Sequence, residues 1–369
     1  MKTYLVGGSV RDELLGLEVQ DRDHVVVGAD AAQMLALGYR PVGADFPVFL
    51  HPETQEEYAL ARTERKTAPG YRGFVFHADP GVTLEEDLRR RDLTINAMAR
   101  AEDGALVDPY GGERDLRARV LRHVSESFGE DPVRILRVAR FAARFDEFTI
   151  APETSELMKR MVASGEVDAL VAERVWQEIA RGLREKRPSR MVSVLHDCGA
   201  LARILPEIDR EFGSPDAVVR LRQRLDEAAL QGHELAVRFA LLVLDLAPPD
   251  ALALALRINA PHDCRDLARL ATQEKAVVRR HDLDAEAALS LIERCDSMRR
   301  PERLERLIAV VECDARCDRP PTSIDGAFLR RALDAARGVD AGAVARENPG
   351  DVPAAVRRAR LAAVEALRK

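Results

Sequence analysis

Residues 4–23 read YLVGGSVRDELLGLEVQDRD, and the local pattern in this stretch decides how the first part of the chain folds. It predicts a short strand, a turn at Gly7 and Gly8, a helix, and a second strand that carries Asp21 and Asp23. Two carboxylates at positions i and i+2 of a strand point to the same face of a sheet and can hold hard cations for an in-line displacement at phosphorus. The glycine turn lets a ligand approach the backbone and offers amide groups to an anion at the following helix. The stretch therefore predicts a site where metal ions and phosphate groups meet.

The composition is typical of a soluble globular protein with two or three domains, since 46% of the 369 residues are hydrophobic and 32% are charged. The net charge of -6 excludes a globally basic protein, so any nucleic-acid surface must be a local patch. The five cysteines are scattered, which predicts reduced thiols and a cytoplasmic protein. We expect no signal peptide and no membrane-spanning segment, because the most apolar stretch is broken by charged residues and prolines.

The predicted elements divide the chain into two regions. Up to about residue 124, short strand-like runs alternate with turns and helices, which predicts an α+β domain with a mostly antiparallel sheet and flanking helices. From Glu130 onward the strand pattern disappears, and amphipathic segments predict an elongated, all-α remainder without a fixed repeat. The segments expected to be helical are residues 131–145, 152–163, 172–185, 188–197, 217–229, 235–246, 264–280, 284–294, 301–313, 326–336 and 352–367.

The pair Asp21 and Asp23 is a weak signal by itself, because an Asp-x-Asp sequence is more often a solvated strand edge than a metal site. Its surroundings strengthen it. Glu57 lies in the strand-like run EEYALAR, where a neighbouring strand could supply a third carboxylate. Further along, residues 88–99 read LRRRDLTINAMA and contribute four more polar side chains, namely Arg90, Arg91, Asp92 and Asn96.

The helix expected over residues 131–145 carries a second chemical signal. Its arginines Arg134, Arg137, Arg140 and Arg144 are spaced three, three and four residues apart, which places them in one stripe. An isolated helix of this kind would most often be a surface helix with its arginines in water. Arginines without acids on the same stripe repel one another, however. The stripe therefore favours a position beside a polyphosphate or an RNA backbone.

Several motifs in the chain together resemble one protein family. They are YLVGGSVRD, DRDHVVVG, FPVFLHPETQEEYALARTERK, LRRRDLTINAMA, DPYGG and FGEDPVRILRVARFAAR, in this order. They are similar to those of the bacterial CCA-adding tRNA nucleotidyltransferases, the eubacterial-type (class II) members of the polymerase β-like nucleotidyltransferase superfamily. The resemblance is dense up to about residue 210 and looser beyond. It implies a nucleotidyltransferase head over residues 1–124, a helical neck with a nucleotide-template helix and an RNA-binding region over 125–210, and an all-α, tRNA-binding body and tail over 211–369.

The resemblance also implies the roles of individual residues at the reacting end of the site. Asp21 and Asp23 would bind the catalytic Mg²⁺, and Glu57 would be a further catalytic acid. The residues that would contact the triphosphate and the sugar of the nucleotide are Gly8, Arg11, Arg91, Asp92 and Asn96.

The arginine-striped helix would read the base. By the same resemblance, Asp131 and Arg134 would act as a protein template that forms Watson–Crick-like hydrogen bonds with the incoming base. A carboxylate can accept from an exocyclic amine, and a guanidinium can donate to a ring nitrogen or a carbonyl. Arg137 and Arg140 would continue the nucleotide contact from the same helix.

The implied activity is the template-independent addition of CCA to the 3′ end of tRNA from CTP and ATP, in tRNA maturation and repair. The expected partners are tRNA and the two nucleotides, with no protein partner evident. A bacterial poly(A) polymerase and a partial, CC- or A-adding enzyme are the alternatives, and a non-catalytic RNA-binding relic is a third. Residues 62–87 contain a segment that looks like the complete specificity loop of the family, with a mobile composition around Thr67–Gly73, which favours full CCA addition. Poly(A) polymerases tend to have an extra basic tail, and the sequence ends soon after LAAVEALRK, so we expect CCA addition rather than poly(A) synthesis.

The second half departs from the family in one respect. Related enzymes carry a metal-dependent His-Asp phosphohydrolase domain, and the segment that corresponds to its signature here reads VRFALLVLDLAPPD, residues 237–250. Leu244 stands where a ligating histidine would be, and only Asp245 remains. The dipeptide His262-Asp263 is more consistent with the start of a helix than with a metal site. We therefore expect a degenerate His-Asp domain without phosphohydrolase activity.

Overall fold

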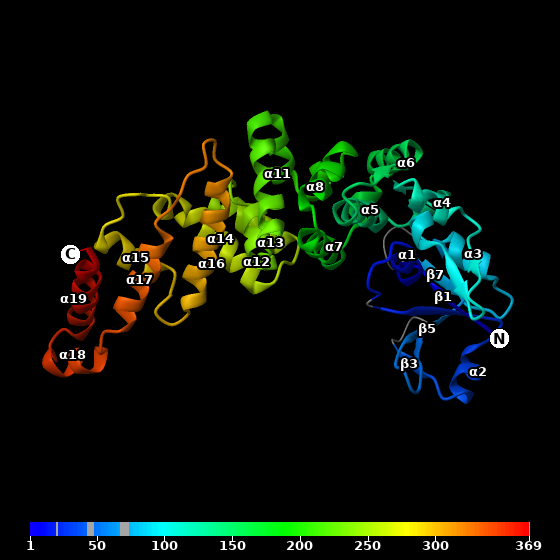
Figure 1. The fold of residues 1–369 in the computed structure, drawn as a ribbon, viewed down its shortest axis with the longest axis horizontal. Coiled ribbons are helices and arrows are strands. Elements are labelled where there is room, and N and C mark those ends of the chain that lie inside the picture. Colours follow the sequence, from blue (N-terminus) through cyan, green and yellow to red (C-terminus); the bar gives the residue numbers. More distant parts are fainter. Residues whose placement is uncertain (20, 43–47, 67–73, 369) are drawn as a thin grey trace. The chain divides into compact units, whose positions relative to one another are not determined.

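The structure, a computed structural model, describes residues 1–19, 21–42, 48–66 and 74–368. The chain packs into two compact units, the first formed by Met1–Glu178 with Arg190–Ile204 and the second by Ile179–Ser189 with Leu205–Lys369. Within the described ranges, no helix combines the length and the apolar character needed to cross a membrane. The predicted order, a sheet-containing head followed by a helical remainder, is confirmed (Figure 1). The three-way division at residues 124 and 210 stays a prediction.

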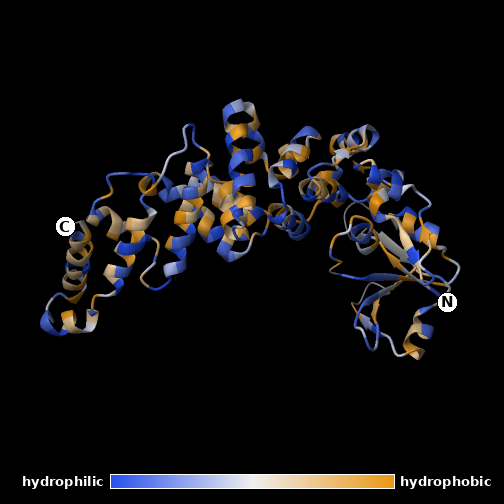
Figure 2. Cartoon of the chain, in the orientation of Figure 1, coloured by the Kyte–Doolittle hydropathy of each residue, from blue (hydrophilic) through white to orange (hydrophobic). Residues whose placement is uncertain are grey.

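The second unit is built of helices, and its core forms around α12 (Leu235–Leu242). Residues 236–242 of this helix are all buried, and α12 packs against α14 and α16. Figure 2 shows hydrophobic and hydrophilic residues sharing single helices, as expected of amphipathic segments. The other helices that lie in this unit are α10 (Pro206–Asp209), α11 (Pro215–Leu230), α13 (Pro248–Arg257), α14 (His262–Val278), α15 (Ala285–Arg294), α16 (Pro301–Arg316), α17 (Gly326–Arg337), α18 (Ala341–Glu347) and α19 (Val352–Glu365).

A buried carboxylate joins three segments of the second unit. Asp314 on α16 accepts from Arg220 of α11 at 3.0 Å and from Arg279, which follows α14, at 2.6 Å. Both arginines also pair with Asp318, at 2.8 Å each. Because the Asp314 side chain is only 4% exposed, its charge depends on these two partners.

The first unit contains a seven-stranded sheet in the order β3-β4-β5-β2-β1-β8-β9. Its strands are β1 (Lys2–Val6), β2 (Asp23–Val27), β3 (Arg40–Val42), β4 (Val48–Leu50), β5 (Glu57–Leu60), β8 (Ala99–Ala101) and β9 (Leu106–Val107). All neighbours are antiparallel except β2 and β5, which run parallel. The sheet is therefore mostly antiparallel, as predicted, with one parallel pair near its centre.

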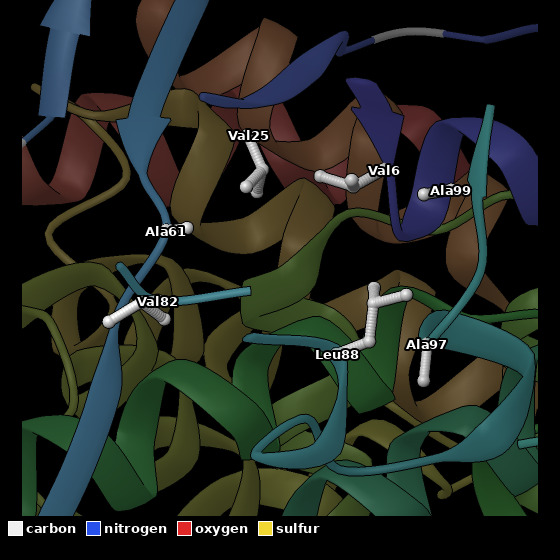
Figure 3. Packing of buried hydrophobic residues seen from close by; sticks show 7 residues of the cluster. All are labelled: Val6, Val25, Ala61, Val82, Leu88, Ala97 and Ala99. Carbon is white, nitrogen blue, oxygen red and sulfur yellow. The ribbon is translucent and has the colours of Figure 1, made fainter. Parts of the chain in front are cut away.

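Successive residues of β2 point to opposite faces of the sheet, and both faces are buried at this strand. Val25 packs with Val6 and with Leu88 of α3 (Leu84–Arg89) in the cluster that Figure 3 shows. Val26 packs instead with Met34 of α2 (Ala31–Ala36). The flanking helices α2 and α3 thus cover opposite faces of the sheet.

Several shorter elements complete the first unit. After β1 comes α1 (Gly8–Leu14), and after α3 come the 3-10 turn η2 (Thr94–Asn96) and α4 (Gly112–Arg117). The predicted striped helix is α5 (Val133–Arg144). It is followed by α6 (Pro152–Ala163), α7 (Ala172–Arg184), α8 (Pro188–Asp197) and α9 (Ala200–Ile204). The boundaries between the two units fall within α7 and within α8, so each of these helices contributes residues to both units.

One prediction about strands needs correction, and one pair of strands was not predicted. The strand pattern does not end at Glu130, because β11 (Thr149–Ile150) pairs in parallel with β10 (Val120–Leu121). A separate antiparallel ribbon, β6 (Thr63–Lys66) with β7 (Phe74–His77), lies outside the seven-stranded sheet. Two-residue strands and charged ribbons lack the alternating hydrophobic pattern from which strands are predicted.

Candidate active site

A cavity of about 560 Å³ in the first unit brings distant segments of the chain together, from β1 to α7. All of the predicted site residues except Asp21 line it. They are Gly8, Arg11, Asp23, Glu57, Arg91, Asp92, Asn96, Asp131, Arg134, Arg137 and Arg140. Arg90 and Arg144, which the sequence analysis named without a role at the site, also line it, as do two arginines that it did not name, Arg62 and Arg174.

The carboxylates at one side of the cavity are placed by the parallel strand pair. Asp23 is the first residue of β2 and Glu57 the first of β5, and the two are direct neighbours in the register. We predicted that Asp21 lies on the same strand as Asp23, and this is wrong. Because β2 begins at Asp23, Asp21 lies in the exposed segment just before the strand. Asp21 lines an adjacent hollow of about 600 Å³ that shares Asp23 and Glu57 with the main cavity. The three carboxylates therefore gather at one edge of the sheet.

The surroundings of Asp23 shift the pKa of its carboxyl group in opposite directions. Partial burial raises the pKa of this carboxyl, the charge of Arg91 lowers it, and the charge of Asp21 raises it again. A divalent cation between the two aspartates would favour the ionised form. In the part of the chain that the structure describes, no group of three or more His, Cys, Asp or Glu side chains is arranged to hold a metal ion. A cation bound here would complete its shell with oxygen atoms of the substrate or of water, as Mg²⁺ commonly does.

The glycine turn lets two guanidinium groups approach the backbone. Gly7 has φ +74°, and a Cβ atom at this position would lie 2.6 Å from Nη1 of Arg91. A Cβ at Gly8 would lie 3.4 Å from Nη2 of Arg11, a tighter contact than usual. Glycine is therefore needed at Gly7 both for the left-handed backbone and for the approach of Arg91.

Asp92 and Asn96 form a buried network beneath the arginines. Asp92 accepts from the backbone amide of Leu93 at 2.8 Å, from Asn96 at 3.0 Å and from Nε of Arg137 at 2.6 Å. Although burial raises it, the pKa of Asp92 is held well below its ordinary value by the Arg137 charge and these hydrogen bonds. Asn96 in turn accepts from Arg11. The network therefore fixes the arginines of α1 and α5 relative to η2.

The arginine stripe of α5 does not suffer the repulsion that its sequence suggested. Arg137 pairs with Asp92, and Arg140 donates to Glu178 of α7 at 2.6 Å. The ring of Phe141 lies beneath the guanidinium group of Arg140, 4.3 Å from its carbon. The compensating acids lie in segments remote from α5, so inspection of the helix by itself could not find them.

The two ends of the stripe are held in different ways. Arg134 donates to the backbone carbonyls of Ser127 at 2.7 Å and Arg90 at 2.6 Å. Arg144 donates to Asp12 of α1 at 3.0 Å, and Asp12 also accepts from Arg11 at 2.8 Å. Asp12 thus joins α1 to α5.

Asp131 has a partner that sequence reasoning missed. Arg174 of α7 binds it with two hydrogen bonds, Nη1 to Oδ1 at 3.1 Å and Nη2 to Oδ2 at 2.7 Å. The backbone amide of Val133 donates to Oδ1 at 3.1 Å. Arg174 and Glu178 stand four residues apart on α7, and this spacing of opposite charges is the signal that could have marked them.

Two other predictions concern loops and the second unit. Residues 67–73, the core of the predicted specificity loop, lie outside the described residues. In the second unit, His262 is the first residue of α14 and Asp263 the second, so the dipeptide begins a helix, as predicted. Leu244 is fully buried.

Asp245, the remaining signature residue, is paired with two cations. It accepts from Arg224 and from Nζ of Lys275, the latter at 2.8 Å. Glu211 lies 3.7 Å from Nη2 of Arg224. Burial raises the pKa of Glu211 to about 7, the Arg224 charge lowers it and the Asp245 charge raises it. Internal cations thus neutralise Asp245.

The fold and the site define a nucleotidyltransferase. Residues 3–122 match the family described as "Poly A polymerase head domain", and residues 147–212 match the one described as "Probable RNA and SrmB-binding site of polymerase A". The "Multifunctional CCA protein" of Azoarcus sp. (strain BH72) is 54% identical over 402 aligned residues, which cover 100% of this chain and 98% of the relative. That of Cupriavidus necator is 53% identical and covers 99% of both chains. The chain belongs to the family of bacterial CCA-adding tRNA nucleotidyltransferases.

Solved structures agree with the fold. The Bacillus stearothermophilus CCA-adding enzyme in complex with CTP is similar with a TM-score of 0.72 at 22% identity, covering 99% of this chain and 89% of that one. The Thermotoga maritima CCA-adding enzyme complexed with tRNA is similar with a TM-score of 0.63 at 23% identity, covering 99% and 87%.

Proposed function

We infer that the protein adds C, C and A in turn to the 3′ end of tRNA, with CTP and ATP as substrates and pyrophosphate as the leaving group. The observation that carries this function is the single cavity in which the carboxylate edge of the sheet faces the arginine-striped helix. A nucleoside triphosphate has the same division, with phosphates at one end and a base at the other. The relatives named as CCA proteins, matched over their whole length, support it.

Mg²⁺ is the metal that we propose for the carboxylate edge, with Asp21 and Asp23 as its protein ligands and Glu57 as a further catalytic acid. These hard oxygen donors suit Mg²⁺, which prefers carboxylates together with phosphate oxygens and water. When bound, Mg²⁺ would help the 3′-hydroxyl of the tRNA lose its proton and would offset charge on the departing pyrophosphate.

The chain's own residues hold the triphosphate in line for attack. The backbone of Gly8 contacts the triphosphate, the guanidinium groups of Arg11 and Arg91 neutralise the phosphate oxygens, and Asp92 and Asn96 keep the arginines in place beside the sugar. The 3′-hydroxyl oxygen then bonds to the α-phosphorus while the bond from that phosphorus to the β-phosphate oxygen breaks. The reaction occurs twice with CTP and once with ATP, and no covalent enzyme intermediate is needed.

Base selection falls to Asp131 and Arg134. On their Watson–Crick edges, cytosine and adenine both present an exocyclic amine beside an unprotonated ring nitrogen, whereas uracil and guanine do not. Oδ2 of Asp131 accepts from Arg174, and a carboxylate oxygen can accept a second hydrogen bond, which the amine would supply. Arg134 would donate to the ring nitrogen, and Arg137 and Arg140 would extend the nucleotide contact along α5.

We propose full CCA addition over the partial and poly(A) alternatives, because the segment around the specificity loop is complete in the sequence. Deletion of residues 67–73 should spare C addition and cripple A addition, whereas equal loss of both would contradict this role. A cytoplasmic setting is also proposed, since the five cysteines are free thiols.

We further propose that the second unit has no phosphohydrolase activity. Leu244 offers no ligand atom, and Asp245 is bound by Arg224 and Lys275. The alignment with the Azoarcus relative spans 402 positions for a chain of 369 residues, so that relative contains residues that this chain lacks. Metal-stimulated hydrolysis of 2′,3′-cyclic AMP by the pure protein would overturn the proposal.

The test of the main function is incorporation of labelled CMP and AMP into tRNA that lacks its 3′ CCA. Wild type should extend the tRNA by three nucleotides, and Asp21→Asn and Asp23→Asn should abolish extension with an unchanged circular-dichroism spectrum. Asp168→Asn is the matched control, since Asp168 loses only an exposed ion pair with Arg203. Near-normal activity in either metal-site variant would defeat the assignment, and addition of A alone in long runs would favour the poly(A) alternative.

A further inference from the structure

Some of the arginines that line the cavity donate hydrogen bonds to carboxylates that do not themselves line it. Asp12, Asp87 and Glu178 are of this kind among the described residues. Asp87 differs from the other two because its side chain is fully buried, whereas those of Asp12 and Glu178 are 11% and 6% exposed.

The Asp87 carboxylate gathers three cavity-lining arginines. Oδ1 accepts from Nη2 of Arg90 at 2.8 Å, from Nε of Arg90 at 3.2 Å, and from the backbone amide of Arg62 at 3.3 Å. Oδ2 accepts from Nη2 of Arg91 at 3.4 Å. Asp87 lies on α3, whereas Arg62 follows β5, so one carboxylate joins the end of a helix to the end of a strand.

The partners of Asp87 point to the phosphate end of the cavity. Nη1 of Arg91 lies against Gly7, in the turn before α1, and donates to the backbone carbonyl of Asn96 at 3.4 Å. Nε of Arg91 is buried and, in the described part of the chain, has no hydrogen-bond partner. Two neighbouring guanidinium groups repel each other unless an anion lies between them. The buried Asp87 charge is such an anion on the protein side, and a triphosphate would be another on the cavity side.

We propose that Asp87 is a positioning residue for triphosphate binding, which holds Arg90 and Arg91 in place without touching the nucleotide. The proposal rests on the proposed function. The base end of the cavity is formed by Asp131, which precedes α5, and by Arg134 on α5. Arg134 contacts Arg90 at its backbone carbonyl and not at the guanidinium group that Asp87 holds. Loss of the Asp87 charge therefore affects affinity for the phosphates, whichever base they carry.

The variant that tests this role is Asp87→Asn, which keeps the size of the side chain, removes its charge and turns one acceptor into a donor. We expect the KM for CTP and the KM for ATP to rise by the same factor of about ten, the change that follows from losing one charge-assisted hydrogen bond. The kcat should stay within about threefold, and the preference for CTP over UTP should not change. Asp168→Asn, which removes an exposed ion pair, should leave every value unaltered.

Direct binding separates this proposal from the proposed function. Isothermal titration of wild type and Asp87→Asn with inorganic tripolyphosphate, which has no base, should show the same tenfold loss of affinity. Unchanged affinity for tripolyphosphate, or a changed CTP to UTP ratio with an unchanged KM, would overturn the positioning role. If wild type binds tripolyphosphate but adds no nucleotide to tRNA, the proposed function fails and the positioning role stands. Should Asp87→Asn not fold, Asp87→Glu, which keeps the charge but moves it by one methylene, must show the same base-independent loss.

Discussion

Replacement of Arg174 by methionine should loosen base selection and leave catalysis largely intact. Arg174 holds both oxygens of Asp131, at 3.1 and 2.7 Å, and methionine keeps the apolar part of the side chain but removes both donors. The backbone amide of Val133 would then be the remaining described donor to the carboxylate, and it contacts Oδ1 alone. Asp131 would be free to rotate about its terminal torsion, which is soft in aspartate.

The size of the effect follows from the strength of the lost hydrogen bonds. A hydrogen bond to a charged group contributes about 1.5–3 kcal/mol. The two hydrogen bonds together would therefore contribute about 3–6 kcal/mol. Because the Arg174 and Asp131 side chains are 25% and 17% exposed, solvent screens the pair, and we take roughly half, about 1.4–2.8 kcal/mol. If this energy holds the carboxylate in the plane that recognises an amine, the preference for CTP over UTP should fall about tenfold to hundredfold.

Single-nucleotide extension of tRNA that lacks CCA measures this directly. The kcat/KM for CTP and for UTP would be determined for wild type, Arg174→Met and the matched control Arg203→Met, which removes an exposed guanidinium group paired with Asp168. We expect the ratio to change in Arg174→Met alone. A uniform fall in kcat/KM for both nucleotides with an unchanged ratio would refute the reasoning, because it would mean that Arg174 supports the fold and not the reading of the base.

Three further outcomes concern stability. Asp314→Asn should destabilise the protein by about 3 kcal/mol in urea unfolding, because it leaves two arginines without their buried partner. Gly112→Ala should cost about 1–3 kcal/mol and lower activity, since a Cβ there would lie 2.2 Å from the carbonyl oxygen of Thr94, in the turn that carries Asn96. Because burial raises the pKa of Glu211 to about 7, from 4.5, the folded protein binds more protons than the unfolded one between these values. Stability should therefore fall by up to about 3 kcal/mol as pH rises from 4.5 through 7, and Glu211→Gln should remove this dependence.

Each of these outcomes has a result that would count against it. Asp334, which lies on the exposed side of α17, supplies a control for Asp314, and equal losses in Asp334→Asn and Asp314→Asn would deny the buried pairing its role. Gly213→Ala is the matched control, because Gly213 does not have a left-handed backbone and an added Cβ there meets no atom within 4 Å. A loss in Gly112→Ala no larger than in Gly213→Ala would contradict the packing argument. A stability difference between wild type and Glu211→Gln that does not change between pH 5 and 8 would contradict the titration of Glu211.

The sequence predicts well those elements that carry local signals. The bounds of α6 and α8 are those predicted, because a proline begins each helix and the apolar spacing persists to its end. The helix α13 was not among the segments expected to be helical, although proline is well suited to the first turn and Pro248 begins this helix. A proline followed by regular apolar spacing therefore predicts the start of a helix, and this rule would also have found α13.

The sequence predicted which residues line the site, but not the hydrogen bonds that hold them in place. The residues that line the cavity belong to motifs that the sequence displays, and their spacing indicated the chemistry. What holds them could not be predicted, because Arg174 and Glu178 reach α5 only through the tertiary fold. Strand order is equally non-local, and no pattern within β2 or β5 indicates that the two run parallel.

The parallel pairing of β2 and β5 determines where the chain can tolerate insertions and deletions. Because both strands begin at the same edge, Asp23 and Glu57 stay neighbours whatever the length of the connection between the strands, provided that the register is kept. A single-residue deletion within β5, by contrast, would turn Glu57 to the opposite face of the sheet. The turns of the segment that joins the two strands should therefore tolerate insertion. The helix α2 and the strand β4 should not be lost, because Met34 of α2 packs against the sheet and β4 pairs with β5. The four residues of β5 should tolerate no change in their number.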